Sequence, residues 1–492
     1  MSSINNEDTD LGKKVFLSAS WLVAGNWVSR LLGIVSTIIL ARILYPDDYG
    51  VVAKGMLLVS FVETVATVDG SRYLIRKPKV DDDDFHTAWT LCVLQFSIIA
   101  LFLFLSAGLF SKFFHEPRLE DVVIVLAIGV LVTGFQNIGL EKYKRNLQFS
   151  KIFIFLMKQR FIGFFVTVAA ALILQTYWAM IIGTVVFRVA GVVLSYFAHS
   201  FRPHFTLKKV KLQWSFTKWI LVNNLASFFR NKVDQVIVSR YFDSSSMGLY
   251  SMGHQLSGMV SNELVAPIYQ ALYPGYAKLQ HDFKGLAKAH INALGALSTI
   301  IFPLAFGLTI LCNDFVVLLL GARWIETVPL IQTLVLVAAA MSINGASSNL
   351  LIALDKVRQV TIIDWLYVLI LIPVLIYTGN ISSMIAVAWA RLLITVFVMP
   401  VYLSMAHNIL PISWGQSLGA LWRPVVAASI MVAVIWSNPL YNKEVGVLSF
   451  MAQIILGGVV YLSVLYGLWI ISGRHYTGEK LLYDKLIGSL KR

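Results

Sequence analysis

Apolar segments of about 20 residues follow one another along almost the whole chain, with short polar loops between them. Each is long enough to cross the hydrocarbon core of a bilayer as an α-helix, which satisfies its backbone hydrogen bonds within one segment. The chain is 58% hydrophobic and 13% charged, too few charges for a soluble protein of 492 residues. We therefore predict an all-α integral membrane protein with about 14 transmembrane helices, at 15–40, 50–69, 87–109, 121–140, 152–174, 177–198, 216–239, 248–273, 288–312, 327–353, 360–378, 382–404, 422–438 and 446–472.

The distribution of Lys and Arg predicts which way these helices run. Basic residues gather in every second loop, as in Arg72–Lys79, Lys142–Lys151 and Arg202–Lys211. The positive-inside rule places such loops in the cytoplasm, and Lys13 and Lys14 before the first helix place the N-terminus there too. We therefore expect both termini in the cytoplasm. The net charge of +14 then reflects loops that face membrane lipids, and nucleic acid is not expected as a partner.

Residues 21–55 return without a gap 198 positions later, at 219–253. Each copy contains a membrane helix, a short polar turn and the start of a second helix. Because six helices separate the copies, both run in the same direction, which is typical of a parallel repeat about an axis along the membrane normal. We expect an N-terminal lobe at 1–210 with helices 1–6, a C-terminal lobe at 211–414 with helices 7–12, and helices 13 and 14 with an amphipathic cytoplasmic tail at 415–492.

No loop is long enough to hold a catalytic domain. The chain also lacks a P-loop, a Gly-rich dinucleotide turn and an HExxH motif. We therefore predict a protein that is not an enzyme, with no catalytic residues, no metal site and no cofactor. The aspartate run Asp81–Asp84 lies beside several basic residues, and we interpret it as a solvated charge run rather than a cation site.

Charged and polar side chains within the predicted helices point to the transport chemistry. A charge at the centre of a bilayer costs about 2.5–3.5 kcal/mol on insertion scales, so it is kept where it meets water or a partner. The first helix carries a polar stripe, and its repeat copy at 216–239 carries a second one, so we expect the two stripes to line a water-filled central cavity. Deep cations are in excess over deep acids, which favours an anionic group on the substrate. The deep cations are Arg30, Arg188, Arg230 and Arg391, with Lys158 and Lys232 somewhat nearer the inner face.

Each deep charge has two interpretations that the sequence leaves open. An arginine can line the cavity or can form a structural ion pair; Arg230 and Asp234 in particular are four residues apart on one helix and can neutralise each other. A buried carboxylate can be structural, or it can carry a proton or bind Na⁺ and so couple transport to an ion gradient. The candidates for ion coupling are Asp234, Glu263, Glu63 and Asp364.

Two segments resemble a known family. The segment Trp21–Ala53 has an Ala-Arg pair at the end of its first helix, then a Pro-Asp turn and a Tyr-Gly step. The segment Asn223–Gly253 has an Asn-rich helix with a central Asp, an Arg at its end, and the sequence Gly-Leu-Tyr-Ser. Both resemble the polysaccharide exporters, the Wzx-type lipid-linked oligosaccharide flippases of the multidrug/oligosaccharidyl-lipid/polysaccharide superfamily. The colanic-acid and teichuronic-acid exporter branch is the most similar.

This resemblance implies a multi-pass transporter of the bacterial inner membrane. Such a protein flips an undecaprenyl-pyrophosphate-linked oligosaccharide by alternating access for surface polysaccharide biosynthesis, either lipopolysaccharide or exopolysaccharide. Its implied partners are the lipid-linked oligosaccharide, membrane lipids, and a polysaccharide polymerase with its chain-length machinery. No cofactor is implied beyond coupling to H⁺ or Na⁺. For the pyrophosphate we expect Arg30, Arg188, Arg230 and Arg391, and for the sugar hydroxyls Asn26, Asn223, Asn224 and Gln255.

Other functions stay open at this stage. A lipid II flippase belongs to the same class and differs only in its substrate. A drug or metabolite antiporter of the superfamily would prefer an anionic cavity, which the excess of arginine disfavours. A membrane-embedded polymerase would need a large outside loop, which is absent from this chain.

Overall fold

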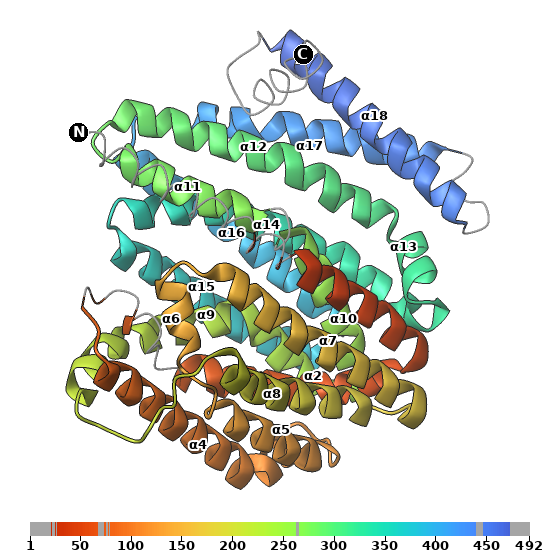
Figure 1. Cartoon of the computed structure of the whole chain (residues 1–492). Helices are drawn as coiled ribbons and strands as arrows, with labels where there is room; N and C mark the ends of the chain where they lie inside the picture. The colour runs from red at the N-terminus through yellow and green to blue at the C-terminus, as the bar shows by residue number, and fades with distance from the viewer. Residues whose placement is uncertain are drawn as a thin grey trace. The chain divides into compact units, whose positions relative to one another are not determined.

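The structure is a computed structural model in which every regular element is helical across the residues that it describes. These residues are 21, 25, 27–66, 73–74, 77, 79–261, 265–438 and 446–472, with the backbone alone at 65–66, 211–223 and 260. A first helix covers 27–43 and the others follow along the chain (Figure 1). They are α2 (Pro46–Ala66), α4 (Asp82–Phe113), α5 (Leu119–Thr133), α6 (Leu140–Arg145), α7 (Phe149–Leu174), α8 (Trp178–Ala198), α9 (Val210–Tyr241), α10 (Ser244–Val260), α11 (Ala266–Lys278), α12 (Phe283–Ile310), α13 (Cys312–Leu319), η2 (Ala322–Thr327), α14 (Val328–Ala353), α15 (Val357–Ile381), α16 (Met384–Ile409), α17 (Trp414–Ser437) and α18 (Val447–Ile471).

Nine helices in the described part of the chain are long and apolar enough to cross a membrane. This confirms the predicted class, an all-α integral membrane protein. The other five predicted spans correspond to the helix at 27–43, to α2, α5 and α9, and to α10 with α11. The count of fourteen therefore stays a prediction for these five, and the predicted amphipathic tail lies outside the described residues. The nine are Asp82–Phe113, Phe149–Leu174, Trp178–Ala198, Phe283–Ile310, Ala322–Ala353, Val357–Ile381, Met384–Ile409, Trp414–Ser437 and Val447–Ile471.

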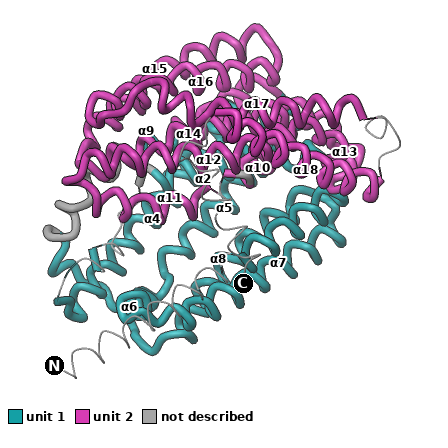
Figure 2. Tube along the Cα trace, turned by 90° about the horizontal axis from the view of Figure 1, so that it is seen from above, with its two compact units in different colours: residues 1–228, 243–248 teal, residues 229–242, 249–492 magenta. Residues whose placement is uncertain are grey.

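The chain divides into two compact units, coloured separately in Figure 2. Unit 1 contains Met1–Phe228 and Asp243–Gly248, and unit 2 contains Phe229–Phe242 and Leu249–Arg492. Helix α9 is thus divided after Phe228, and the first turn of α10 belongs to unit 1.

The core of unit 1 is built from α2, α4, α5 and α8. Leu58 of α2, Leu103 of α4, Val122 and Leu126 of α5, and Ile181 of α8 are all buried in one apolar cluster. Because lipid tails are as apolar as these side chains, close van der Waals packing in this cluster holds the four helices together. Ion pairs lie at both ends of unit 1, around Arg118 at one end and around Asp84 at the other.

The predicted repeat is present in the register of the helices. The first helix ends at residue 43 and α9 ends at Tyr241, while α2 begins at Pro46 and α10 begins at Ser244. Both pairs of boundaries differ by the 198 positions found in the sequence. The two copies therefore form the same helix–turn–helix, with matching ends.

The two turns of the repeat pack on each other within unit 1. A Cβ atom on Gly50 would overlap the carbonyl oxygen of Ser244, and a Cβ atom on Gly248 would overlap that of Pro46. Gly50 and Gly248 are equivalent residues of the repeat, as are Pro46 and Ser244, so the contact is reciprocal. Small residues allow this close approach of two helices in a membrane protein.

Unit 2 has α14 near its centre. Val335 and Ile343 of α14 pack in one buried cluster with Leu297 of α12, Leu403 of α16 and Leu421 of α17. Helices α12, α17 and α18 lie side by side in Figure 1, and direct contacts join α17 to both neighbours. The N-terminal turns of α12 and α17 lie at one end of the unit, which is the cytoplasmic end on the predicted topology.

Candidate functional site: two polar cavities and three ion pairs

Three of the four deep arginines predicted to bind substrate meet a carboxylate predicted to couple ions. The i, i+4 pairing of Arg230 with Asp234 is not the arrangement found, because each of these residues reaches a partner on another helix. Across the described residues the pairs are Arg188 with Glu63, Arg230 with Asp364, and Arg391 with Asp234.

The pair of Arg391 and Asp234 joins α16 to α9 and is deeply buried. The side chains are 3% and 0% exposed, and the hydroxyl of Tyr250 donates to Asp234 Oδ2 at 2.7 Å. Removing one partner of a buried pair leaves an uncompensated charge, which costs about 3–5 kcal/mol. We therefore interpret this pair as a structural connection between the two helices.

The pair of Arg230 and Asp364 joins α9 to α15. Arg230 Nη1 donates to both carboxylate oxygens of Asp364, at 2.8 and 3.0 Å. The hydroxyl of Tyr402 on α16 donates to Asp364 Oδ1 at 2.6 Å. The arginine side chain is 30% exposed, so one face of it stays accessible.

The pair of Arg188 and Glu63 joins α8 to α2 within unit 1. Arg188 Nη1 donates to Glu63 Oε1 at 2.8 Å and to Thr133 Oγ1 at 3.2 Å. The side chains are 16% and 28% exposed. Both line a cavity of about 760 Å³ inside unit 1, whose other polar lining residues include Gln95, Gln136, Asn137, Glu141, Lys144, Gln159 and Thr184.

A second cavity, of about 620 Å³, lies within unit 2. Arg391 and Lys232 supply its cations, and no carboxylate is among the described residues that line it. Lys232 Nζ donates to Gln235 Oε1 at 3.4 Å, a neutral acceptor. Because Asp234 neutralises Arg391, Lys232 provides the net positive charge of this cavity. The imidazole of His254 and a set of amides and hydroxyls complete its polar lining: Asn231, Gln255, Ser257, Ser261, Tyr269 and Ser342.

The other predicted substrate residues have different positions. Arg30 is half-buried on the first helix. Asn224 Nδ2 donates to the carbonyl oxygen of Thr64 at 3.1 Å, which connects α9 to α2 within unit 1. Asn26, Glu263 and the side chain of Asn223 lie outside the described residues. The predicted substrate residues do not include Lys232, which directly follows Asn231 of the polar stripe and is predicted only as a cation nearer the inner face.

A group of charges connects the helix ends at one end of unit 1. Arg118, in the turn between α4 and α5, donates to both oxygens of Asp47 at 2.6 and 3.0 Å and to Glu116 Oε1 at 2.8 Å. The hydroxyl of Ser244 donates to the other oxygen of Glu116. Burial alone would raise the pKa of Glu116, but the hydrogen bonds from Arg118 and Ser244 lower this pKa to about 2. The charged form of Glu116 is therefore the one that the folded protein favours.

We expect Glu116→Gln to destabilise the protein at neutral pH and much less in acid. The pKa of Glu116 is about 2 in the folded state and 4.5 for an unperturbed glutamate. The ionised side chain therefore stabilises the folded protein fully above pH 4.5, and this stabilisation declines as the pH falls toward 2. A shift of this size corresponds to about 3 kcal/mol at pH 7. Thermal unfolding in detergent at pH 7 and pH 3 measures it, with the exposed Glu120→Gln as control. An equal loss for Glu116→Gln at both pH values would contradict the assignment.

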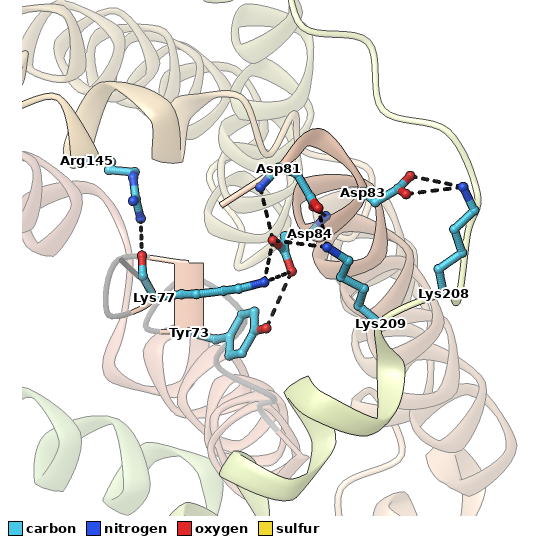
Figure 3. Close-up of polar contacts among 8 residues, drawn as sticks. All are labelled: Tyr73, Lys77, Asp81, Asp83, Asp84, Arg145, Lys208 and Lys209. Carbon is cyan, nitrogen blue, oxygen red and sulfur yellow. Dashed lines mark hydrogen bonds and ion pairs between the residues drawn. The ribbon is translucent and has the colours of Figure 1, made fainter. Parts of the chain in front are cut away.

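The aspartate run forms an ion-pair network at the other end of unit 1 (Figure 3). Asp84 is fully buried, and Lys77 Nζ donates to both of its oxygens at 2.8 Å, which raises the pKa of Lys77. Lys208 pairs with Asp83 at 3.2 Å, and Lys209 pairs with Asp81. The interpretation as a solvated charge run therefore needs a correction at Asp84. The run holds the segment before α9 on the first turn of α4, and the described residues contain no cluster of three His, Cys, Asp or Glu side chains fit for a metal ion.

The fold defines the class of the protein. The chain is similar to the structure of a lipid II flippase, MurJ, in an inward-closed conformation, with a TM-score of 0.74, 17% identity, and coverage of 91% of this chain and 98% of that one. At this identity the similarity shows the fold alone, that of an all-helical membrane protein.

Sequence comparison then gives the family. The model of the family described as "Polysaccharide biosynthesis protein" matches residues 39–329, and the chain belongs to this family. The chain is also similar to the lipopolysaccharide biosynthesis protein WzxC of Escherichia coli, with 23% identity over 84% of this chain and 85% of the relative. It is similar to the succinoglycan biosynthesis transport protein ExoT of Rhizobium meliloti, with 21% identity over 72% and 71%.

These comparisons confirm the resemblance found in the sequence. The chain is a multi-pass protein of the bacterial inner membrane, and it is a transport protein of polysaccharide biosynthesis rather than an enzyme.

Proposed function

We propose that the protein flips an undecaprenyl-pyrophosphate-linked oligosaccharide across the inner membrane by alternating access, for the synthesis of a surface polysaccharide. The observation that carries this proposal is the cavity of unit 2. It places the charge of Lys232 beside the amides of Asn231 and Gln255 and beside several hydroxyls. A cation suits a pyrophosphate, and amides and hydroxyls suit the hydroxyl groups of a sugar. The relatives in lipopolysaccharide and succinoglycan biosynthesis support the same substrate class.

Arg188 is the arginine that we propose to bind the pyrophosphate in unit 1. Its pair with Glu63 lines a large cavity and is 16% and 28% exposed, whereas the pair of Arg391 with Asp234 borders the cavity of unit 2 but is only 3% and 0% exposed. A phosphate oxygen can therefore replace Glu63 as the partner of Arg188 without the exposure of a charge that is buried in the protein interior. A proton or Na⁺ taken up by Glu63 would weaken its hold on Arg188, which would couple transport to an ion gradient.

The other predicted residues keep supporting roles in this proposal. Arg30 and Arg230 are further contacts for the pyrophosphate, and Asn26, Asn223 and Asn224 are further contacts for the sugar. Asp364, Asp234 and Glu263 are alternative sites of ion coupling. The termini face the cytoplasm, and the protein works with a polysaccharide polymerase and its chain-length machinery.

Transport in proteoliposomes tests this function. Wild type is expected to translocate a fluorescent undecaprenyl-pyrophosphate oligosaccharide, and Lys232→Gln and Arg188→Gln are each expected to slow it about tenfold or more, since a charged hydrogen bond contributes about 1.5–3 kcal/mol. The exposed Lys356→Gln at the start of α15 is the matched control. Folding of each variant is checked by its thermal unfolding in detergent.

Two results would overturn the proposal. Efflux of soluble drugs or cations, without translocation of any lipid-linked sugar, would identify an antiporter. Translocation of lipid II in preference to other lipid-linked oligosaccharides would identify a lipid II flippase.

A further inference from the structure

Two adjoining cavities lie along α7 and α8 of unit 1, which pack side by side (Figure 1). The basic cavity, of about 200 Å³, is lined by Lys151 and Lys158 of α7 and by Tyr143 of α6. The apolar cavity, of about 450 Å³, continues from it, and Ile154, Lys158 and Leu194 line both. None of these residues is among those proposed above to bind the transported substrate.

The two lysines of the basic cavity lie on one face of α7. They are seven residues apart, which is two turns of a helix or about 10 Å along its axis. Side chains of an α-helix lean toward its N-terminus, so Lys158 extends back toward Lys151. Helix α7 begins at Phe149, and on the predicted topology this end of the helix faces the cytoplasm. Both charges therefore lie toward the inner face of the membrane.

The lining of the two cavities does not balance these charges. Both lysines are exposed, and no carboxylate is among the described residues that line either cavity. Glu141, the acidic residue of α6, pairs with Lys144 at 2.6 Å. The ammonium of Lys151 lies 4.7 Å from the centre of the Tyr143 ring, a neutral group. An anion is therefore the ligand that the basic cavity favours.

The apolar cavity has no polar lining residue beyond Lys158. Ile154, Phe161 and Ile162 on α7 are 51%, 41% and 38% exposed. Lipid tails are as apolar as such side chains, so this cavity suits an acyl chain. Lys158 lies nine positions after Phe149, within the predicted span, and a charge at such a depth is kept where it meets water or a partner. The remaining apolar lining residues are Phe153, Met157 and Leu194.

We infer that the two cavities bind one anionic membrane phospholipid, with its phosphate between Lys151 and Lys158 and an acyl chain along the apolar cavity. A free phosphate would satisfy the lysines but would leave the apolar cavity without a role. The lipid-linked sugar is less suited. Apart from its lysines and Tyr143, the basic cavity is lined by apolar side chains, which offer no amides to the hydroxyl groups of a sugar.

Native mass spectrometry of the protein in detergent tests this site. With phosphatidylglycerol and phosphatidylethanolamine in equal amounts, wild type is expected to retain phosphatidylglycerol in preference, because that lipid carries a net negative charge. Lys151→Gln and Lys158→Gln are each expected to weaken this retention about fivefold, and the double variant about thirtyfold, since each basic residue near an anionic lipid contributes comparably. The double variant Lys151→Arg/Lys158→Arg keeps both charges and is expected to retain the lipid.

Ile154→Trp tests the apolar cavity separately from the charges. Ile154 lines both cavities, so a larger ring fills the space for the lipid while both lysines remain, and retention is expected to fall. Ile362→Trp on α15 is the matched control, because Ile362 is 48% exposed against 51% for Ile154. Lys356→Gln/Arg358→Gln removes two exposed charges of α15. Both controls are expected to retain phosphatidylglycerol as wild type does, and thermal unfolding without added lipid checks the folding of every variant.

Three outcomes would overturn the inference. These are equal retention of the two lipids, wild-type retention by Lys151→Gln/Lys158→Gln, and wild-type retention by Ile154→Trp. Displacement of phosphatidylglycerol by inorganic phosphate at equal concentration would identify a site for a free anion and would also overturn it. Displacement by undecaprenyl pyrophosphate at equal concentration would assign the site to the transported substrate, with the same consequence. The measurement needs no transport, so its result is independent of the proposed function.

Discussion

Arg391→Gln is expected to lower the free energy of unfolding by about 3–5 kcal/mol, because it leaves the carboxylate of Asp234 buried without its cation. Asp234 is 0% exposed, and the remaining contact from the Tyr250 hydroxyl is neutral. The thermal unfolding temperature of the purified protein in detergent measures the loss. A yield of folded protein well below wild type at the same expression temperature would accompany it.

A second variant separates loss of the pair from loss of the arginine side chain. Arg391→Gln/Asp234→Asn removes both charges, so it is expected to recover most of the stability that the single variant loses. Arg358→Gln, an exposed arginine on α15, is expected to unfold as wild type does. Wild-type stability of Arg391→Gln would contradict a buried pair, as would a double variant no more stable than the single one.

The sequence predicts the helices and the repeat well because both are encoded locally. The apolar segments account for the nine spans that meet the criteria for a membrane helix, and the repeat predicts that the helix ends at 43 and Tyr241 correspond. The same register predicts that α2 and α10 begin at equivalent residues, Pro46 and Ser244. Each of these features depends on residues within one or two turns of a helix.

The partners of the deep charges could not be predicted in the same way. The sequence identified Arg188, Arg230 and Arg391, and it also identified the three carboxylates that they meet. Spacing along a helix, however, finds only neighbours on that helix. Arg188 lies 125 positions from Glu63, and Arg230 lies 134 positions from Asp364. Pairs at such separations depend on how the helices pack.

The exposure of each ion pair distinguishes the two roles, cavity lining or structural pairing, that the sequence left open for its arginine. Two arginines of similar depth in the sequence, Arg188 and Arg391, both line a cavity but differ in the structure, because the pair of Arg188 is partly exposed and the pair of Arg391 is almost fully buried. The same holds for cations near helix ends. Lys284 and Lys288 are four residues apart on α12, and only the packing of α12 on α17 brings Arg423 to the cavity that they line.

Gly50→Ala and Gly248→Ala are each expected to destabilise unit 1 by at least about 3 kcal/mol, which is the upper end for overpacking a tightly packed site. The added methyl group overlaps a backbone carbonyl of the opposite turn, at Ser244 for Gly50 and at Pro46 for Gly248. A side chain could turn away from the methyl group, but a carbonyl at the start of a helix moves only with the helix. The two helix–turn–helix copies would therefore have to separate at their contact.

Thermal unfolding in detergent compares these variants with glycines that have room. Gly458→Ala in α18 and Gly275→Ala in α11 add the same methyl group where nothing lies within 4 Å, so neither is expected to lower stability. The reciprocal contact also predicts that Gly50→Ala and Gly248→Ala have similar effects, because each meets the equivalent carbonyl of the other copy. If either variant were as stable as Gly458→Ala, the close packing of the two repeat turns would be wrong. If only one were destabilised, the contact would not be reciprocal.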